Sequence, residues 1–311
     1  MKRKRISIGI PCFNEEKNVE KAYTLLKQTT SKIKNYTFEF IFVDNGSNDR
    51  TRDRINSLVK KDTRVTGIFL SRNFGPEASG QAALDHSTAD AFIFYEADMQ
   101  DPPSLIATFI HKWEQGYQII LGIRDKIEDP ALITAARKLF YKIFKSISNI
   151  EVPINAGSYG LIDKKVMHAL AQIPEKYRFY RGLRAWVGFK TAYVHYKRKK
   201  RQFGISSYNL YQYIKHSERG IFGFSYLVLD IMIYFGFLLV IASFLFIIGY
   251  LLLFLFFGNP IKGAVTILVS IVFFGGIQLL AISIIGKYIQ VVVEETKARP
   301  IYIIDEIINK T

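Results

Sequence analysis

The segment Glu96–Pro103 (EADMQDPP) carries the residue types and spacing that most directly suggest chemistry. Glu96 and Asp98 stand two positions apart after a short apolar run, so both are expected to point into one pocket. Their carboxylates and the carboxamide of Gln100 are hard oxygen ligands that suit Mg²⁺ or Mn²⁺. An ion held there would offset the charge that develops on a departing pyrophosphate. The simpler alternative is a solvated acidic turn before a helix.

A second polar turn follows the apolar residues that end at Val43. It places Asp44 and Ser47 near the end of a predicted strand, where Asp44 is able to accept hydrogen bonds from a base or a ribose. The alternative is an Asx-type turn that only begins the next helix.

A third candidate is the segment Pro11–Glu15, where the ring of Phe13 and the carboxylate of Glu15 could hold a nucleoside. Alone this pattern is weak. Cys12 is the only cysteine, so an internal disulfide is impossible and a reducing compartment fits.

Alternating strands and helices must position these residues. Strands are predicted at 6–10, 39–43, 65–70, 91–95 and 118–122, with loop and strand at 155–165. Helices are predicted at 15–34 (with Asn14 as its N-cap), 49–61, 76–88, 103–115 and 137–147. This alternation indicates a mostly parallel α/β sheet, whose ligands bind beyond the carboxyl ends of the strands.

Two long uncharged runs, Ile231–Phe257 and Gly263–Gly286, follow this α/β region. At 1.5 Å per residue each is long enough to cross a hydrocarbon core of roughly 30 Å. The link 258–262 is short, so an antiparallel hairpin is expected. The basic run His195–Arg201 precedes the hairpin, whereas the link offers only Lys262. By the positive-inside rule, the polar part should face the cytoplasm.

The chain therefore divides into five expected parts. These are a globular domain at 1–207, an amphipathic juxtamembrane segment at 208–224, membrane helices at 225–257 and 263–290, and a cytoplasmic tail at 291–311. The net charge is +15. With membrane spans present, anionic lipid headgroups and phosphorylated substrates explain this charge better than nucleic acid does.

The order and spacing of the motifs resemble the family 2 inverting glycosyltransferases, in the polyprenyl-phosphate branch that includes dolichol-phosphate mannose synthases and bactoprenol glucosyltransferases. The similar segments are Pro11–Glu15, Val43–Thr51, Ser71–Gly75, Glu96–Pro103, Gly122–Arg124, Lys138–Tyr141, Leu161–Val166, Phe179–Leu183 and Arg198–Tyr208. The resemblance implies a GT-A fold, with a Rossmann-like, mostly parallel sheet, followed by a C-terminal two-helix transmembrane hairpin.

The resemblance also implies an activity. We expect metal-dependent, inverting transfer of a sugar from a nucleotide-sugar to undecaprenyl phosphate, with a UDP-sugar favoured and a GDP-sugar as the other option. The expected location is the cytoplasmic (inner) membrane, as a multi-pass protein with its catalytic domain facing the cytoplasm. A homo-oligomer fits the family, and nucleic acid is not an expected partner.

Residue roles follow from matching positions. The nucleotide-sugar is expected to contact Pro11, Phe13, Glu15, Asp44, Ser47, Glu96 and Ala97. Asp98 and Gln100 are the expected metal pair. The catalytic residues implied around the donor and acceptor phosphates are Asp98, Arg124, Arg137, Ser158 and Arg201.

The chain departs from the family pattern at several positions. Residues Gly157–Gly160 read GSYG where the family commonly has GDFR. Ser207 stands where the family has a lysine. Pro76 follows the Asn-Phe-Gly segment, where the family often has a basic residue or histidine. Ser158 therefore removes a candidate catalytic carboxylate. A lipid monophosphate already carries about −1.5 to −2 charges at pH 7 and needs no general base, so we expect activity with an altered sugar preference.

Two alternatives remain at this point. The first is a nucleotide-sugar-binding pseudoenzyme that regulates or scaffolds a membrane complex, which the departures motivate. The second is a processive polysaccharide synthase of the same superfamily, which would need a Gln-x-x-Arg-Trp acceptor motif and usually more membrane spans, and the sequence shows neither.

Overall fold

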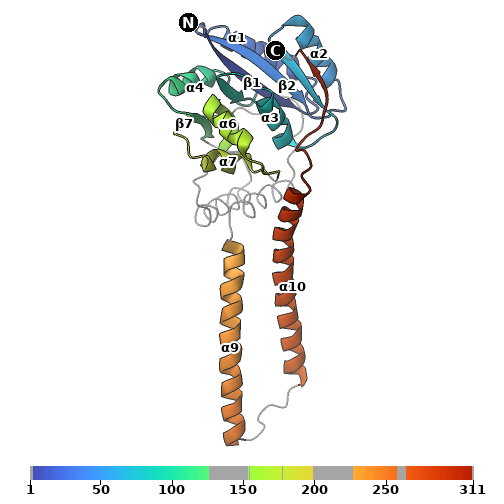
Figure 1. Ribbon diagram of the computed structural model, residues 1–311, viewed down its shortest axis with the longest axis vertical. Coiled ribbons are helices and arrows are strands. Elements are labelled where there is room, and N and C mark those ends of the chain that lie inside the picture. The colour runs from blue at the N-terminus through green and yellow to red at the C-terminus, as the bar shows by residue number, and fades with distance from the viewer. Residues whose placement is uncertain are drawn as a thin grey trace.

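A computed structural model describes residues 3–125, 153, 155–176, 178–198, 227–257 and 264–309. Figure 1 shows an α/β body from which two long helices extend. The body is built on an eight-stranded sheet in the order β7-β5-β6-β4-β1-β2-β3-β8. Its strands are β1 (Lys4–Cys12), β2 (Tyr36–Asp44), β3 (Val65–Leu70), β4 (Ala91–Phe94), β5 (Ile119–Arg124), β6 (Ala156–Asp163), β7 (Thr191–Tyr196) and β8 (Ile304–Ile308).

Parallel pairing dominates the sheet. β1 pairs in parallel with both β2 and β4, β2 pairs with β3, and β5 pairs with β7. β6 runs antiparallel to β4 and β5, and β8 runs antiparallel to β3. This topology confirms the expected α/β class with a mostly parallel sheet.

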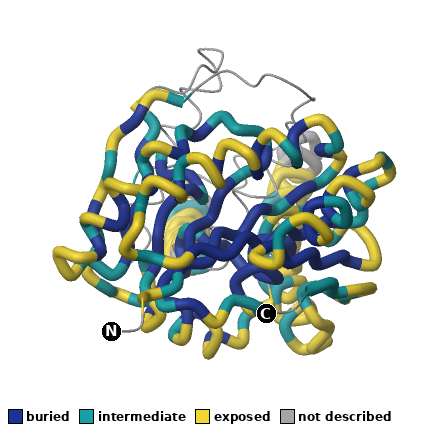
Figure 2. The backbone as a smooth tube through the Cα atoms, turned by 90° about the horizontal axis from the view of Figure 1, so that it is seen from above, coloured by how far each residue is buried: buried dark blue, intermediate teal, exposed yellow. Residues whose placement is uncertain are grey.

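Helices cover both faces of the sheet. They are α1 (Val19–Thr30), α2 (Thr51–Lys61), α3 (Pro76–Asp85), α4 (Leu105–Glu114), α6 (Lys164–Gln172) and α7 (Tyr180–Trp186). The apolar sides of α1, α2 and α4 pack on one face, and those of α3, α6 and α7 pack on the other. The central strands are therefore buried on both faces and appear as the dark-blue centre in Figure 2.

The packing against the strands is close. A Cβ atom at Gly9 of β1 would lie 2.3 Å from the ring of Phe92, so only glycine fits there with this backbone. Interiors packed this densely transmit small shifts instead of absorbing them. The sheet therefore fixes the positions of the loops at its edge.

The start of α1 differs from the prediction. The helix begins at Val19 with Asn18 as its N-cap residue, so the prediction of Asn14 as the cap is wrong. Asn14 has a left-handed backbone, with φ of 54°. Its side-chain oxygen instead accepts a hydrogen bond of 2.9 Å from the backbone N–H of Asn48. The predicted helix 137–147 lies outside the described residues.

Helices α9 (Leu227–Phe257) and α10 (Ala264–Thr296) form the two long rods in Figure 1. They contain candidate membrane spans at Ile231–Tyr250 and Ser270–Thr296, with mean hydropathies of 2.8 and 1.8 and none of either window buried inside the protein. So many exposed apolar side chains are unfavourable in water and favourable in a bilayer. The two helices therefore indicate membrane association.

The chain returns from α10 to the sheet as strand β8. The carbonyl of Ile303 accepts a hydrogen bond of 3.0 Å from Ser71, and Arg52 forms ion pairs with Asp305 and Glu306 at 2.8 and 2.6 Å. The side chain of Asn309 donates to the carbonyls of Thr63 and Val65 at 2.8 Å each. The end of α10 thus lies against the α/β body, as Figure 1 shows.

Candidate functional site

The carboxyl ends of three central strands meet at one edge of the sheet. Cys12 at the end of β1 pairs with Asp44 at the end of β2. On the other side of β1, Gly9 pairs with Phe94, and its carbonyl accepts a hydrogen bond of 3.0 Å from Tyr95. The segment after β4 therefore starts beside the loops after β1 and β2, which brings the three candidate segments together.

The turn after β2 is held firmly. Asp44 is buried, and its Oδ1 atom accepts a hydrogen bond of 3.2 Å from the N–H of Ser47. Ser47 Oγ accepts a hydrogen bond of 2.9 Å from the N–H of Asn14. Burial raises the pKa of Asp44, while the hydrogen bonds from Ser47 lower it. The turn is thus an Asx-type structure that also presents a carboxylate at the sheet edge.

This turn requires glycine at position 46. Its φ is +67°, and a Cβ atom there would lie 2.5 Å from the backbone carbon of Arg72. The neighbouring Asn45 side chain donates to the carbonyl of Gly75 at 3.0 Å and accepts from the N–H of Phe74 at 3.0 Å. The loops after β2 and β3 are therefore one packed unit.

The residues at the end of β1 and directly after it differ in exposure and in contacts. Pro11 and Phe13 are partly exposed at the sheet edge. Glu15 is buried, its N–H donates to Thr51 Oγ1 at 2.8 Å, and its carboxylate accepts a hydrogen bond from the side chain of Asn18. These contacts make Glu15 a support for the loop and leave Phe13 as the more accessible side chain.

Three carboxylates follow β4 and gather around one arginine. The Nη2 atom of Arg198 lies 2.7 Å from Glu96 Oε2 and 3.7 Å from Asp98 Oδ2. Its Nε atom lies 3.2 Å from Asp101 Oδ1. Glu96 and Asp98 therefore converge on a single cationic group, although they differ in exposure.

Asp101 is the buried member of this group. Its side chain is only 1% exposed, and its Oδ1 atom accepts a hydrogen bond of 2.6 Å from the hydroxyl of Tyr196. Arg124 Nη2 lies 3.9 Å from its other oxygen, and Arg124 Nε donates to the Tyr196 hydroxyl at 3.3 Å. Burial and the charge of Glu96 raise the pKa of Asp101. The two arginines keep its carboxylate paired.

Two buried tyrosines fix the backbone of the same loop. The hydroxyl of Tyr95 donates to the carbonyl of Asp101 at 3.2 Å, and that of Tyr159 donates to the carbonyl of Pro102 at 2.9 Å. The rings of Tyr95 and Tyr159 meet edge to face at 5.6 Å. These contacts hold the backbone of Asp101 and Pro102 against the two tyrosines.

Asp98, one of the two residues predicted to bind a metal, is largely buried. Its Oδ1 atom accepts a hydrogen bond of 3.2 Å from the N–H of Gln100, across the left-handed Met99, whose φ is 56°. Burial, followed by the charge of Glu96, raises the pKa of Asp98 to about 6. Among the described residues, no group of three or more His, Cys, Asp or Glu side chains is arranged to hold a metal.

The residues present nevertheless fit a divalent ion shared with a substrate. Glu96 and Asp98 already converge on one positive charge, at Arg198 Nη2. Mg²⁺ uses one or two carboxylates and completes its shell with water and phosphate oxygens. The two carboxylates meet that requirement, and Gln100 lies in the same loop, where its backbone N–H donates to Asp98. Ala97 is buried between the two acidic residues.

Arg124 and Ser158 lie on the neighbouring strands β5 and β6. A Cβ atom at Gly157 would lie 2.8 Å from Arg124 Nη2, so glycine makes room for that guanidinium. The buried Arg184 of α7 donates to the carbonyls of Gly157 and Ser158 at 2.8 and 3.3 Å. The structure thus places Gly157, the residue before Ser158, against the guanidinium of Arg124. Arg137 and Arg201 lie outside the described residues.

The sequence reading assigned no role to Arg198, Asp101 or Tyr196. Asp101 belongs to the acidic motif, three residues after Asp98, and this spacing could have identified it as a candidate site residue. Arg198 belongs to the basic run before the hairpin, which predicted a membrane anchor. Its contact with Glu96 joins positions 102 apart in the chain, and no local pattern reveals such a pair.

Comparison with known proteins gives the family. The family model described as glycosyl transferase family 2 matches residues 7–170. A prophage bactoprenol glucosyl transferase homolog of Escherichia coli K12 is 37% identical over 304 residues, covering 97% of this chain and 99% of that protein. The bactoprenol glucosyl transferase of Shigella phage SfX is 36% identical over 301 residues, covering 96% and 98%.

Among solved structures, the mannosyltransferase PcManGT of Pyrobaculum calidifontis, in complex with GDP-Man and Mn²⁺, is similar with a TM-score of 0.46. It is 13% identical, and the similarity covers 70% of this chain and 62% of that one. The match of the family model over half of the chain and the full-length similarity to curated relatives lead to one conclusion. This chain belongs to glycosyl transferase family 2.

Proposed function

We propose that this glycosyltransferase moves a sugar from a nucleotide-sugar onto polyprenyl phosphate, with inversion and with the help of Mg²⁺ or Mn²⁺. The observation that carries the proposal is the convergence of Glu96 and Asp98 on one cation position at the edge of the sheet. That position lies on the loop next to the Asp44 turn, because β1 pairs with both β2 and β4. A nucleoside and its diphosphate would thus span adjacent loops.

The proposal gives different roles to the side chains of the site. Phe13, Asp44 and Ser47 are the contacts proposed for the nucleoside. A bound divalent ion would offset the negative charge of the departing diphosphate. Arg124 and Arg198 lie beside the carboxylates and offer planar guanidinium groups, which suit phosphate oxygens.

The acceptor explains why no catalytic carboxylate is needed at position 158. A lipid monophosphate is already anionic at pH 7, so its oxygen attacks the anomeric carbon without a general base. The residues of the site then have to position the two reactants and stabilise charge. Ser158 follows the glycine that packs against Arg124, and a carboxylate at position 158 would add negative charge close to an incoming phosphate.

The membrane helices support a lipid acceptor. Three relatives are named bactoprenol glucosyl transferases, and each match covers 96% of this chain. The two candidate spans in α9 and α10 support an α/β body held at a membrane surface, where a polyprenyl phosphate headgroup lies. We place the body on the cytoplasmic side of the inner membrane, with both helices spanning it, and propose UDP-sugars as the favoured donors.

Product analysis by mass spectrometry tests the proposal. Detergent-purified full-length protein would be incubated with undecaprenyl phosphate, Mn²⁺ or Mg²⁺ and a panel of UDP- and GDP-sugars. A glycosylated lipid phosphate is expected from one donor. Asp98→Ala should abolish it, and Asp53→Asn, an exposed acidic position on α2, should leave it intact. Donor binding without turnover of any sugar would favour the pseudoenzyme instead.

A further inference from the structure

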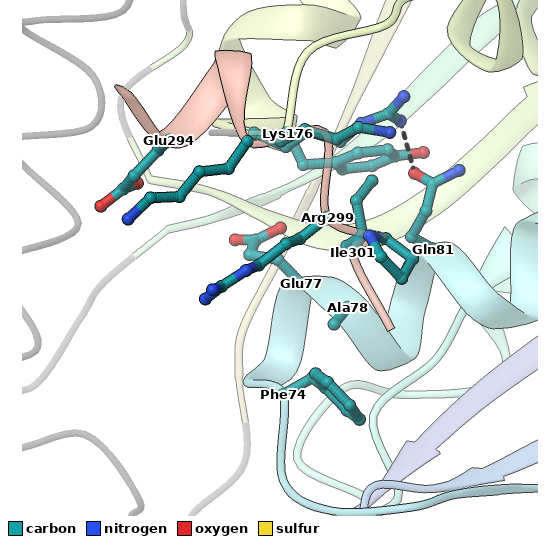
Figure 3. A pocket seen from close by; sticks show the side chains of 12 residues that line it. Phe74, Glu77, Ala78, Gln81, Lys176, Glu294, Arg299 and Ile301 are labelled. Atoms are coloured by element: carbon teal, nitrogen blue, oxygen red, sulfur yellow. Dashed lines mark hydrogen bonds between the residues drawn. The ribbon is translucent and has the colours of Figure 1, made fainter. Parts of the chain in front are cut away.

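A cavity of about 370 Å³ lies where the end of α10 meets the α/β body. Its walls come from the first turns of α3, the segment around residues 176–180, and the chain from the last turn of α10 to Ile301. Figure 3 shows the side chains of Glu77, Lys176 and Arg299 gathered around it. The volume falls in the range of roughly 300–1,000 Å³ that is common for ligand pockets.

Basic side chains outnumber acidic ones in its lining, which contains Lys176, Arg178, Lys297 and Arg299 against Glu77 and Glu294. Arg178 is already committed, because it donates to Gln81 Oε1 at 2.8 Å and to the carbonyl of Glu175 at 2.9 Å. Within the described part of the chain, the side chains of Lys176, Lys297 and Arg299 have no ion-pair or hydrogen-bond partner. These three cations are therefore available to an anion.

Tyr180 gives an independent indication of a ligand. Its side chain lines the cavity, is only 7% exposed, and has a hydroxyl without a hydrogen-bond partner among the described residues. Its ring is held edge to face against Phe94 at 4.8 Å, so the hydroxyl stays where it is. A buried polar group without a partner is unfavourable, and an oxygen atom of a ligand in the cavity would accept its hydrogen bond.

The position of the cavity identifies the source of that ligand. Lys297 and Arg299 directly follow α10, which ends at Thr296, so they lie where the candidate span leaves the membrane. Basic residues at this level are attracted to anionic headgroups. The lining also includes the apolar side chains of Phe74, Ala78 and Ile301, which suit the glycerol portion of a lipid.

We propose that this cavity binds the phosphate headgroup of an anionic membrane phospholipid. The phosphate oxygens accept from the Tyr180 hydroxyl and are paired with Lys297, Arg299 and Lys176. None of the carboxylates that surround Arg198 lines the cavity, so this site is separate from the one proposed for the donor. It fastens the end of α10 and the start of α7 to the membrane surface.

Native mass spectrometry of the full-length protein tests this inference. Detergent-purified protein would be titrated with phosphatidylglycerol, with phosphatidylcholine, which is zwitterionic and has no net charge, as the comparison. Tyr180→Phe removes only the hydroxyl and keeps the ring against Phe94. It should weaken binding of the first phosphatidylglycerol about fivefold, and Lys297→Gln/Arg299→Gln about tenfold or more, since each basic residue contributes about 1 kcal/mol near an anionic surface.

The matched control is Lys60→Gln/Lys61→Gln, which removes the same charge from the last turn of α2 and should bind phosphatidylglycerol as the unmodified chain does. Equal loss in this control, or unchanged binding in both cavity variants, overturns the proposal. Millimolar inorganic phosphate serves as the competing probe. Displacement of the lipid by phosphate alone would show a site for soluble phosphate and overturn the lipid assignment, whereas retention of the lipid supports it.

Discussion

Arg198 occupies the position at which the proposed metal would meet Glu96 and Asp98, so the guanidinium and the metal should compete for these carboxylates. The replacement Arg198→Met keeps an unbranched, flexible side chain and removes the guanidinium group with its charge. We expect it to tighten the binding of Mn²⁺ to the protein without nucleotide, although it removes a phosphate contact and should therefore lower the transfer rate.

The magnitude follows from the contacts. At about 4 Å and an effective dielectric constant of about 20, two unit charges interact by about 4 kcal/mol. Arg198 is 23% exposed and Glu96 is 40% exposed, so solvent screening reduces the difference to about 1–2 kcal/mol. That corresponds to a dissociation constant for Mn²⁺ lower by about 5- to 30-fold.

Titration of free Mn²⁺ by electron paramagnetic resonance measures this constant directly. Arg64→Met is the matched control, because Arg64 pairs with Asp62 at 2.7 Å, away from the acidic loop. The control should bind Mn²⁺ as the unmodified chain does. If Arg198→Met bound Mn²⁺ equally or more weakly while remaining folded, the cation position assigned to Glu96 and Asp98 would be refuted.

Three further results are expected. Because the pKa of Asp98 is raised from 3.8 to about 6, its protonation should weaken Mn²⁺ binding as the pH falls from 7 to 5 in calorimetric titrations, and Asp98→Asn should remove this pH dependence. Gly46→Ala should lower the free energy of unfolding by about 3 kcal/mol or more, since it adds a backbone clash to an unfavourable φ. The control is Gly116→Ala, where φ is +86° and nothing lies near the added Cβ. It should lower the free energy of unfolding by only about 1 kcal/mol. Thermal melts of both variants measure the two changes. Deleting residues 304–311 should uncover the edge of β3 and accelerate proteolysis of the α/β body, whereas equal digestion rates would show that β8 adds no stability.

The central strands could be predicted because they are buried on both faces. All six residues of β3 are buried, and such strands appear in a sequence as continuous apolar runs. β7 and β8 escaped prediction for the opposite reason. They are the two edge strands of the sheet, and β8 has the sequence IDEII with two exposed acidic side chains. Its pairing with β3 depends on a partner more than 230 residues away.

The candidate site was predictable to the extent that topology alone determines it. Parallel strands bring their carboxyl ends to one edge, and this rule correctly placed the loops after Cys12, Asp44 and Phe94 together. It gives no information about which cation balances the acidic loop. Arg198 reaches that loop from the chain beyond β7, and the position of β7 in the sheet depends on its pairing with β5.

The departure at position 160 bears on whether the chain is an enzyme or a pseudoenzyme. Where the family commonly has arginine, a Cβ atom at Gly160 would lie 2.3 Å from the carbonyl oxygen of Ile120, so no side chain fits between β5 and β6 with this backbone. Positive charge is nevertheless present, because Arg124 and Arg198 both lie within 4.0 Å of Asp101. The two guanidinium groups reach this acidic loop from the end of β5 and from the chain beyond β7, where a departing diphosphate would need positive charge. The substitutions are therefore better explained by a rearranged phosphate site than by its loss, and this favours the transferase.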